Sequence, residues 1–191
     1  MIDLANAMPL FSRKPRIKEF EAVALPHLHE LFRTASRLLG DAARAEDAVQ
    51  DVYLLAWKSF DTFETGTNCR AWLFHLLFHK LRHYRRKWLT PREMQDAEEV
   101  IGGVPAWPAF SPGLTDDEVL EALAAVSPEY RAVILLVDVE EFSYKDAAGI
   151  LGVPAGTLMS RLSRARGLLR ERLVCIAEAH GIGRRMEGKS A

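Results

Sequence analysis

Cysteine is scarce in this sequence of 191 residues, which contains only two. Cys69 and Cys175 form no CxxC pair, so a disulfide framework is excluded and a reducing compartment is expected. No apolar run approaches the roughly 20 residues that a transmembrane helix needs. The start carries Asp3 early and lacks the apolar segment of a signal peptide. These absences predict a cytoplasmic protein without membrane insertion.

Alternating runs of β-branched residues are also missing, whereas apolar residues recur at helical spacing, which predicts an all-α fold. Gly40 and Asp41 mark a helix stop and a helix start, and Ser127 and Ser143 are placed to cap later helices. The expected helices cover about 20–39 with a break at Pro26, 44–59, 69–88, 116–125, 128–138, 144–151 and 155–179.

Charge of one sign is missing from long segments, although the net charge of the chain is only -1. No acid occurs between Arg70 and Arg92, and no base occurs between Glu93 and Glu121. Five arginines and one acid follow over 161–172. Two basic elements separated by an acidic, glycine- and proline-containing linker suit contact with a polyanion. Solvated helix faces would give the same charge pattern.

Three histidines recur at four-residue spacing, at His75, His79 and His83. Zinc accepts such spacing but requires three or four convergent ligands, often with a carboxylate, and this basic segment has no acid. We therefore expect no metal or other cofactor, and instead a cationic surface suited to phosphates and unstacked bases. A helical projection places that outward surface at Trp72, His75, His79, Arg82 and Arg86, opposite an apolar stripe.

The second half contains a short helix, the turn GVP and a longer helix with arginines, which is the helix-turn-helix pattern. Arginine suits guanine edges in a major groove, although an ordinary surface helix also carries arginines. The buried side of the longer helix is predicted at Leu158, Leu162, Ala165, Leu169 and Leu173, and the opposite side carries Thr157, Ser160, Arg161 and Arg164.

Residues 31–87 and 117–173 resemble regions 2 and 4 of extracytoplasmic-function (ECF) sigma factors. The resemblance rests on AEDAVQDVYLLAW, FDTFETGTN followed by RAWLF, SYKDAAGILGVPAGT and SRLSRAR, in the family's order and spacing. It implies two small helical domains joined by a flexible linker. The implied bounds are an extension over 1–19, region 2 over 20–89, the linker over 90–114, region 4 over 115–175 and a tail over 176–191.

The resemblance also implies a non-enzymatic factor that binds bacterial core RNA polymerase and directs promoter recognition, DNA melting and transcription initiation. Polymerase contacts would come from Asp47, Gln50 and Asp51. Contacts to the minus-ten element would come from Asn68, Trp72, His75, His79, Arg82 and Arg86, with Asn68 capturing an extruded base or capping its helix. Contacts to the minus-thirty-five element would come from Lys145, Thr157, Ser160, Arg161 and Arg164. An anti-sigma factor is a further implied partner.

The sequence departs from the family where the third helix reads HKLRHYRRK, with His79 and His83 and no acid. This departure leaves open both the minus-ten preference and whether the histidines, which titrate near neutrality, make DNA binding pH-sensitive. Leu158 and Met159 stand where many relatives have valine and a basic residue, so one phosphate contact is expected to be missing.

The sequence argues against three alternatives to a sigma factor. A sigma mimic that sequesters an anti-sigma factor usually carries a receiver domain, which is not found here. An ordinary helix-turn-helix repressor would leave the first ninety residues unexplained. A metal-dependent hydrolase would need a carboxylate-rich constellation around the histidines, which the sequence does not provide.

Overall fold

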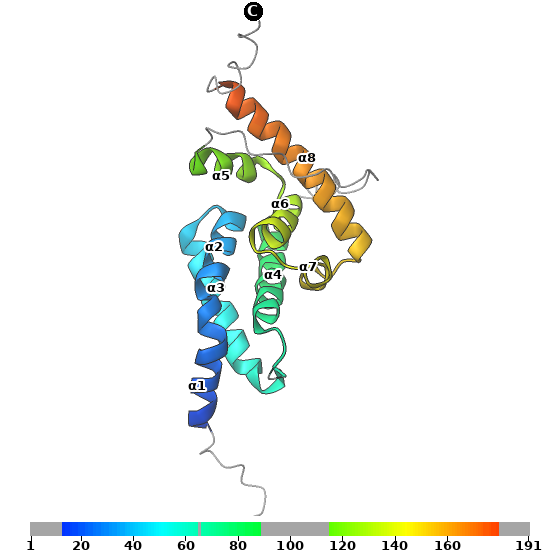
Figure 1. Cartoon of the computed structure of the whole chain (residues 1–191). Helices are drawn as coiled ribbons and strands as arrows, with labels where there is room; N and C mark the ends of the chain where they lie inside the picture. Colours follow the sequence, from blue (N-terminus) through cyan, green and yellow to red (C-terminus); the bar gives the residue numbers. More distant parts are fainter. Residues whose placement is uncertain (1–12, 65, 89–114, 180–191) are drawn as a thin grey trace, which may run out of the picture.

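The computed structural model describes residues 13–64, 66–88 and 115–179 (Figure 1). Every regular element within these ranges is helical, which confirms the predicted all-α fold. The first half holds α1 (Arg13–Ala24), η1 (Leu25–His27), α2 (Leu28–Leu39), α3 (Ala42–Ser59), η2 (Phe60–Thr62) and α4 (Cys69–Trp88). The second half holds α5 (Asp116–Ala125), α6 (Pro128–Ile134), η4 (Leu135–Val139), α7 (Tyr144–Leu151) and α8 (Ala155–Ala179). The predicted linker lies outside the described residues.

Local capping explains why several predicted bounds are right. Gly40 ends α2 in the left-handed conformation, at φ 68°, which glycine adopts at little cost. Asp41 accepts a hydrogen bond from the backbone N–H of Arg44 at 3.0 Å, and Ser143 caps α7 in the same way. Ser127 occupies the N-cap position of α6 as predicted, but its side chain makes no capping hydrogen bond.

Two helix predictions need correction. The first helix begins at Arg13 rather than near residue 20, and η1, which contains Pro26, separates it from α2. The helix predicted over 128–138 is an α-helix only to Ile134 and then continues as the π-helical η4. This widened turn ends in a sharp loop, where the N–H of Glu140 donates to the Leu135 carbonyl at 2.8 Å.

A continuous apolar core joins the two halves of the molecule. In the first half α2, α3 and α4 pack together, and in the second half α8 packs on α5, α6 and α7. The helix α4 also lies against α7 of the second half, and α2 contacts α5 and α6 (Figure 1). The rings of Phe74 in α4 and Phe142 before α7 meet edge-on, with centroids 4.9 Å apart. The two helical domains are therefore closed against each other.

Candidate functional site

The outer face of α3 combines polar residues with an exposed leucine. Asp47 and Gln50 are exposed, and the carboxylate of Asp51 lies 2.8 Å from the ammonium nitrogen of Lys80 in α4. Leu54 follows at helical spacing on the same face and is 58% exposed, the most exposed large apolar side chain among the described residues. Sequence reasoning missed Leu54, although its place one turn after Gln50 was a usable signal.

The loop between α3 and α4 is anchored by a row of aromatic rings. Phe60 packs against Phe63 with centroids 5.8 Å apart, and Phe63 packs against Trp72 at 4.8 Å. Trp72 is half-buried, so the prediction that its ring faces outward is wrong. The exposed Asn68 accepts the N–H of Ala71 at 3.0 Å, which confirms that it caps α4. The aromatic row therefore fixes the loop that carries Asn68.

The helix α4 separates into a buried and an exposed side much as the projection predicts. Leu73, Leu77 and Leu81 are buried, whereas His75, His79 and Arg82 are exposed. The guanidinium of Arg82, however, donates to the Leu151 carbonyl at the end of α7, at 2.5 Å. The side chains of His83 and Arg86 lie outside the described residues. DNA contact by these side chains remains a prediction.

The helices α7 and α8 have the geometry of a helix-turn-helix. Gly152 ends α7 at φ 65°, a left-handed conformation that favours glycine, and Val153 donates to the Ala148 carbonyl at 3.0 Å. The predicted apolar side of α8 is buried at Leu158, Leu162, Ala165 and Leu169, with Leu173 partly buried against the core. Met159 is 39% exposed on the outside of this helix.

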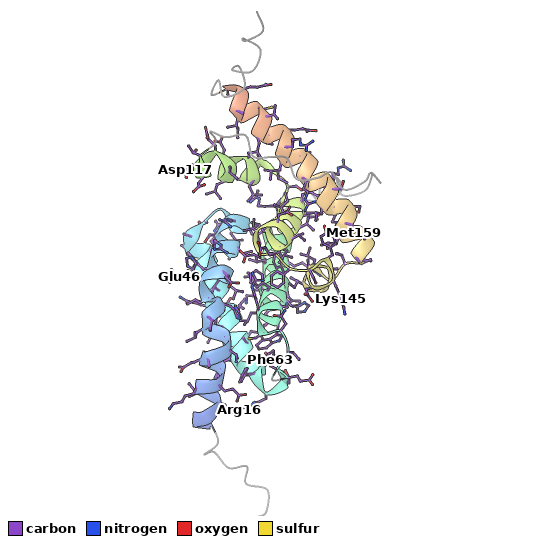
Figure 2. The ribbon with its side chains drawn as sticks, viewed as in Figure 1. Arg16, Glu46, Phe63, Asp117, Lys145 and Met159 are labelled. Atoms are coloured by element: carbon purple, nitrogen blue, oxygen red, sulfur yellow. The ribbon has the colours of Figure 1, made fainter. Side chains whose placement is uncertain are left out.

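The residues predicted to read DNA in the second half surround this motif. Lys145 in α7 and Arg164 in α8 are exposed, and Thr157, Ser160 and Arg161 are partly exposed. The hydroxyl of Ser160 donates to the Thr157 carbonyl at 3.0 Å. Figure 2 shows Lys145 and Met159 at the corner of the molecule where α7 meets the start of α8. The structure therefore brings these residues to one surface.

Arg166 belongs to the same basic segment but has a structural partner. Its guanidinium nitrogens lie 2.6 and 3.2 Å from the two carboxylate oxygens of Asp138, and both side chains are 13% exposed. The hydrogen bonds to Asp138 outweigh the effect of burial and raise the pKa of Arg166. This bidentate pair fastens α8 to η4.

A buried carboxylate at the junction of the two halves was missed by sequence reasoning. The side chain of Glu140 is 1% exposed and accepts hydrogen bonds from three residues of the first half. These donors are Arg33 at 2.9 Å, Thr34 at 3.1 Å and Arg70 at 2.9 Å. We call these four residues the Glu140 cluster. Its members are separated by up to 107 positions in the chain, so no local pattern points to it.

Arg70 extends the Glu140 cluster on both sides. It also donates to Glu30 at 2.5 Å, and its guanidinium lies over the ring of Phe142 at 4.2 Å. Burial of Glu30 favours its neutral form, but the hydrogen bond and the charge of Arg70 prevail and lower the pKa of Glu30. The Glu140 cluster therefore joins charge pairing to aromatic packing.

A second polar contact between the halves comes from the buried Arg131. One guanidinium nitrogen of Arg131 lies 3.1 Å from the Arg37 carbonyl and 3.4 Å from the Leu38 carbonyl, at the C-terminal end of α2. The other nitrogen donates to the carbonyls of Ala124 and Val126. A cation at a helix C-terminus is stabilised by the partial negative charge there.

Comparisons with known proteins decide between the alternatives. The family model "Sigma-70 region 2" matches residues 24–90, and "Sigma-70, region 4" matches residues 116–169. The ECF RNA polymerase sigma factor EcfG of Rhodopseudomonas palustris is 38% identical over 136 residues, which cover 71% of this chain and 74% of that protein. This chain belongs to the ECF sigma factor family. It is a non-enzymatic RNA polymerase sigma factor that directs transcription initiation, and the predicted identity is confirmed.

Two solved structures are similar to this sigma factor over most of its length. The sigma factor RpoE of Bartonella quintana, in complex with the anti-sigma factor NepR, has a TM-score of 0.65 and is 39% identical. That match covers 82% of this chain and 98% of RpoE. CnrH, in complex with the cytosolic domain of CnrY, has a TM-score of 0.58, is 25% identical and covers 85% of this chain and 90% of CnrH.

No group of three or more histidine, cysteine or acidic side chains in the described ranges could hold a metal ion. None of the described helices is long and apolar enough to cross a membrane.

Proposed function

We propose that this sigma factor uses three separate surfaces to bind polymerase and the two promoter elements. The outer face of α3, with Asp47, Gln50 and Asp51, binds core RNA polymerase, and Leu54 adds apolar contact. The loop before α4 and the exposed side of α4 hold the minus-ten strand. The helices α7 and α8 read the minus-thirty-five element. The proposed bounds are 20–89 for region 2 and 115–175 for region 4, within a cytoplasmic protein.

The helix-turn-helix surface is the observation that carries this proposal. Arg161 and Arg164 stand near the start of α8, which is the end of a recognition helix that enters the major groove. A bidentate arginine–guanine contact discriminates against the wrong base by about 1–3 kcal/mol. Lys145 in α7 is exposed beside this surface and suits a phosphate. These cationic and polar side chains can therefore contact both the phosphate backbone and the bases of the DNA.

Strand capture in region 2 is proposed for Asn68 and the exposed side of α4. Each opened base step costs roughly 1.4 kcal/mol, so an open promoter needs compensating contacts to the exposed strand. The aromatic row from Phe60 to Trp72 holds the Asn68 loop in place, as a site for an extruded base requires. His75 and His79 present hydrogen-bonding groups on the same helix.

An anti-sigma factor is proposed as the regulatory partner. Both similar solved structures are described as complexes, RpoE with the anti-sigma factor NepR and CnrH with the cytosolic domain of CnrY. The 39% identity to RpoE supports a NepR-like protein as the class of partner. Copurification of this chain with a NepR-like protein from the same organism would test the assignment.

Run-off transcription tests the whole proposal. Purified protein is mixed with bacterial core polymerase and fragmented genomic DNA from its source, and transcript starts are sequenced. Starts that share two upstream elements and are absent with core alone are expected. Binding to core without any start would instead favour a sigma mimic, and no binding to core would contradict the assignment of the α3 surface.

A further inference from the structure

The contact between the two domains combines apolar packing with several hydrogen-bonded charges. Glu140 is held by Arg33, Thr34 and Arg70, and Arg131 and Arg82 add two more hydrogen-bonded contacts across the junction. A buried ion pair stabilises little relative to apolar packing but fixes one arrangement, because an unpaired buried charge is strongly unfavourable. Such an interface suits two domains that close in one defined arrangement and can also separate.

The side chain of Glu140 has no partner in its own domain among the described residues. Its three hydrogen bonds all go to region 2, although it lies in the loop between η4 and α7 of region 4. Glu141, the next residue, adopts φ 53°, a left-handed conformation uncommon for a residue other than glycine. The loop places Glu140 and Phe142 in contact with region 2, whereas Glu141 is exposed. These contacts stabilise the closed arrangement rather than region 4 itself.

The closed arrangement is incompatible with reading both promoter elements. The minus-ten and minus-thirty-five elements are about 25 base pairs apart, or about 85 Å at about 3.4 Å per base pair. In the structure α7 lies directly against α4, and Leu151 of α7 accepts a hydrogen bond from Arg82 at 2.5 Å. This hydrogen bond also engages the side chain of Arg82, which is one of the residues proposed to hold the minus-ten strand.

We propose that the Glu140 cluster is an autoinhibitory contact that holds free sigma factor in a closed state, from which it must open to bind a promoter. The inference rests on the proposed function for the need to open, but the closure itself can be measured without polymerase. Only open molecules can bind polymerase and promoter together. The apparent affinity is therefore the intrinsic affinity multiplied by the open fraction. Weakening the Glu140 cluster should therefore activate the protein.

Single-molecule energy transfer between the domains measures closure directly. One dye is attached to the exposed Cys175 in α8 and the other to position 43 in α3 after Ala43→Cys, with the buried Cys69 replaced by alanine. Glu140→Gln keeps the shape of the side chain but removes its charge and turns an amide N–H₂ toward a guanidinium. The ratio of open to closed molecules should rise by about tenfold or more, since a buried, hydrogen-bonded charge loses its partner.

Glu141→Gln is the matched control, because it makes the same charge change one residue away on an exposed side chain. It should leave the open fraction unchanged. Arg33→Gln, in the other domain, should open the molecule as Glu140→Gln does, and the double variant should add little to either single one. Far-ultraviolet circular dichroism would establish that each variant is folded, so that opening is not mistaken for unfolding of region 4.

The outcomes separate this inference from the proposed function. With limiting sigma factor, Glu140→Gln should raise run-off transcription by the factor by which the open fraction rises. A folded Glu140→Gln variant with an unchanged closed fraction, or a wild type that is already open, would overturn the inference while transcription remained intact. Opening by Glu140→Gln without transcription from any variant would uphold the autoinhibitory contact and overturn the proposed promoter function.

Discussion

The two basic helices, α4 and α8, have similar charge in the sequence but use it differently in the structure. In α4, Arg70 pairs with Glu30 and Glu140, and Arg82 donates to region 4. In α8, Arg166 pairs with Asp138, whereas Arg161 makes no ion pair among the described residues. The difference shows that a run of basic residues holds both structural cations and cations available to a ligand. Burial and partners, rather than spacing, decide which is which.

The largest expected effect comes from the aromatic ring at the start of α4. Trp72→Ala removes the ring that packs against Phe63 at 4.8 Å. Because the ring is half-buried, we expect a loss of about 2 kcal/mol in the free energy of unfolding, less than the roughly 3–5 kcal/mol of a fully buried tryptophan. Urea unfolding measures the loss, and Trp72→Phe should recover most of it.

The variant Trp72→Phe distinguishes a Trp72 ring that only positions the Asn68 loop from one that contacts the DNA strand directly. If the ring only positions the Asn68 loop, Trp72→Phe should restore promoter opening together with stability. Opening can be followed by permanganate reactivity of unpaired thymines in a promoter found by run-off transcription. A stable Trp72→Phe variant that still fails to open the promoter would mean that the indole itself contacts the strand.

A matched pair of substitutions in α8 tests whether an arginine with an ion-pair partner serves the fold and one without serves DNA binding. Arg161→Ala should reduce transcription from a promoter with an intact minus-thirty-five element by about 10- to 100-fold, the equivalent of about 1–3 kcal/mol, with unfolding unchanged. Arg166→Ala should instead lower the free energy of unfolding by about 1–3 kcal/mol, because Asp138 loses its bidentate partner. If both variants lose only transcription, the structural assignment of Arg166 is wrong.

Much of this organisation could be predicted from local sequence. The bounds of α4, α5, α7 and α8 agree with the prediction, because caps such as Asn68, Ser143 and Gly152 act within four residues of the chain. The exposed side of α8 followed from its periodicity. In contrast, the inward turn of Trp72 depends on Phe63, which a projection of one helix does not include.

The Glu140 cluster could not be predicted, because every hydrogen-bond partner of the Glu140 side chain lies at least 70 positions away in the chain. The stretch VEEF, taken alone, indicates a solvated acidic loop. Its burial depends on the π-helical turn that precedes it and on arginines supplied by α2 and α4. Long-range charge pairing of this kind appears only when the two domains are brought together.

The smallest expected effect concerns the structural role of Arg70. The pKa of Glu30 is lowered from its ordinary value of 4.5 because Arg70 outweighs the effect of burial. A carboxyl with a lowered folded-state pKa contributes stability above pH 4.5, and this contribution is lost as pH falls through the folded-state value. Partial exposure keeps the contribution below about 1 kcal/mol.

Urea unfolding between pH 7 and pH 3 measures this contribution, with Glu30→Gln as the variant. Glu30→Gln should lower the free energy of unfolding at pH 7. The difference from the unmodified chain should shrink as pH falls toward 3, because protonation of Glu30 removes the stabilising charge of its carboxylate. An equal stability difference at both ends would mean that the loss comes from packing, and Arg70 would then lose its assignment as the charge partner of Glu30. A difference that fades toward low pH would confirm that the first arginine of α4 serves the fold, as Arg166 serves it in α8.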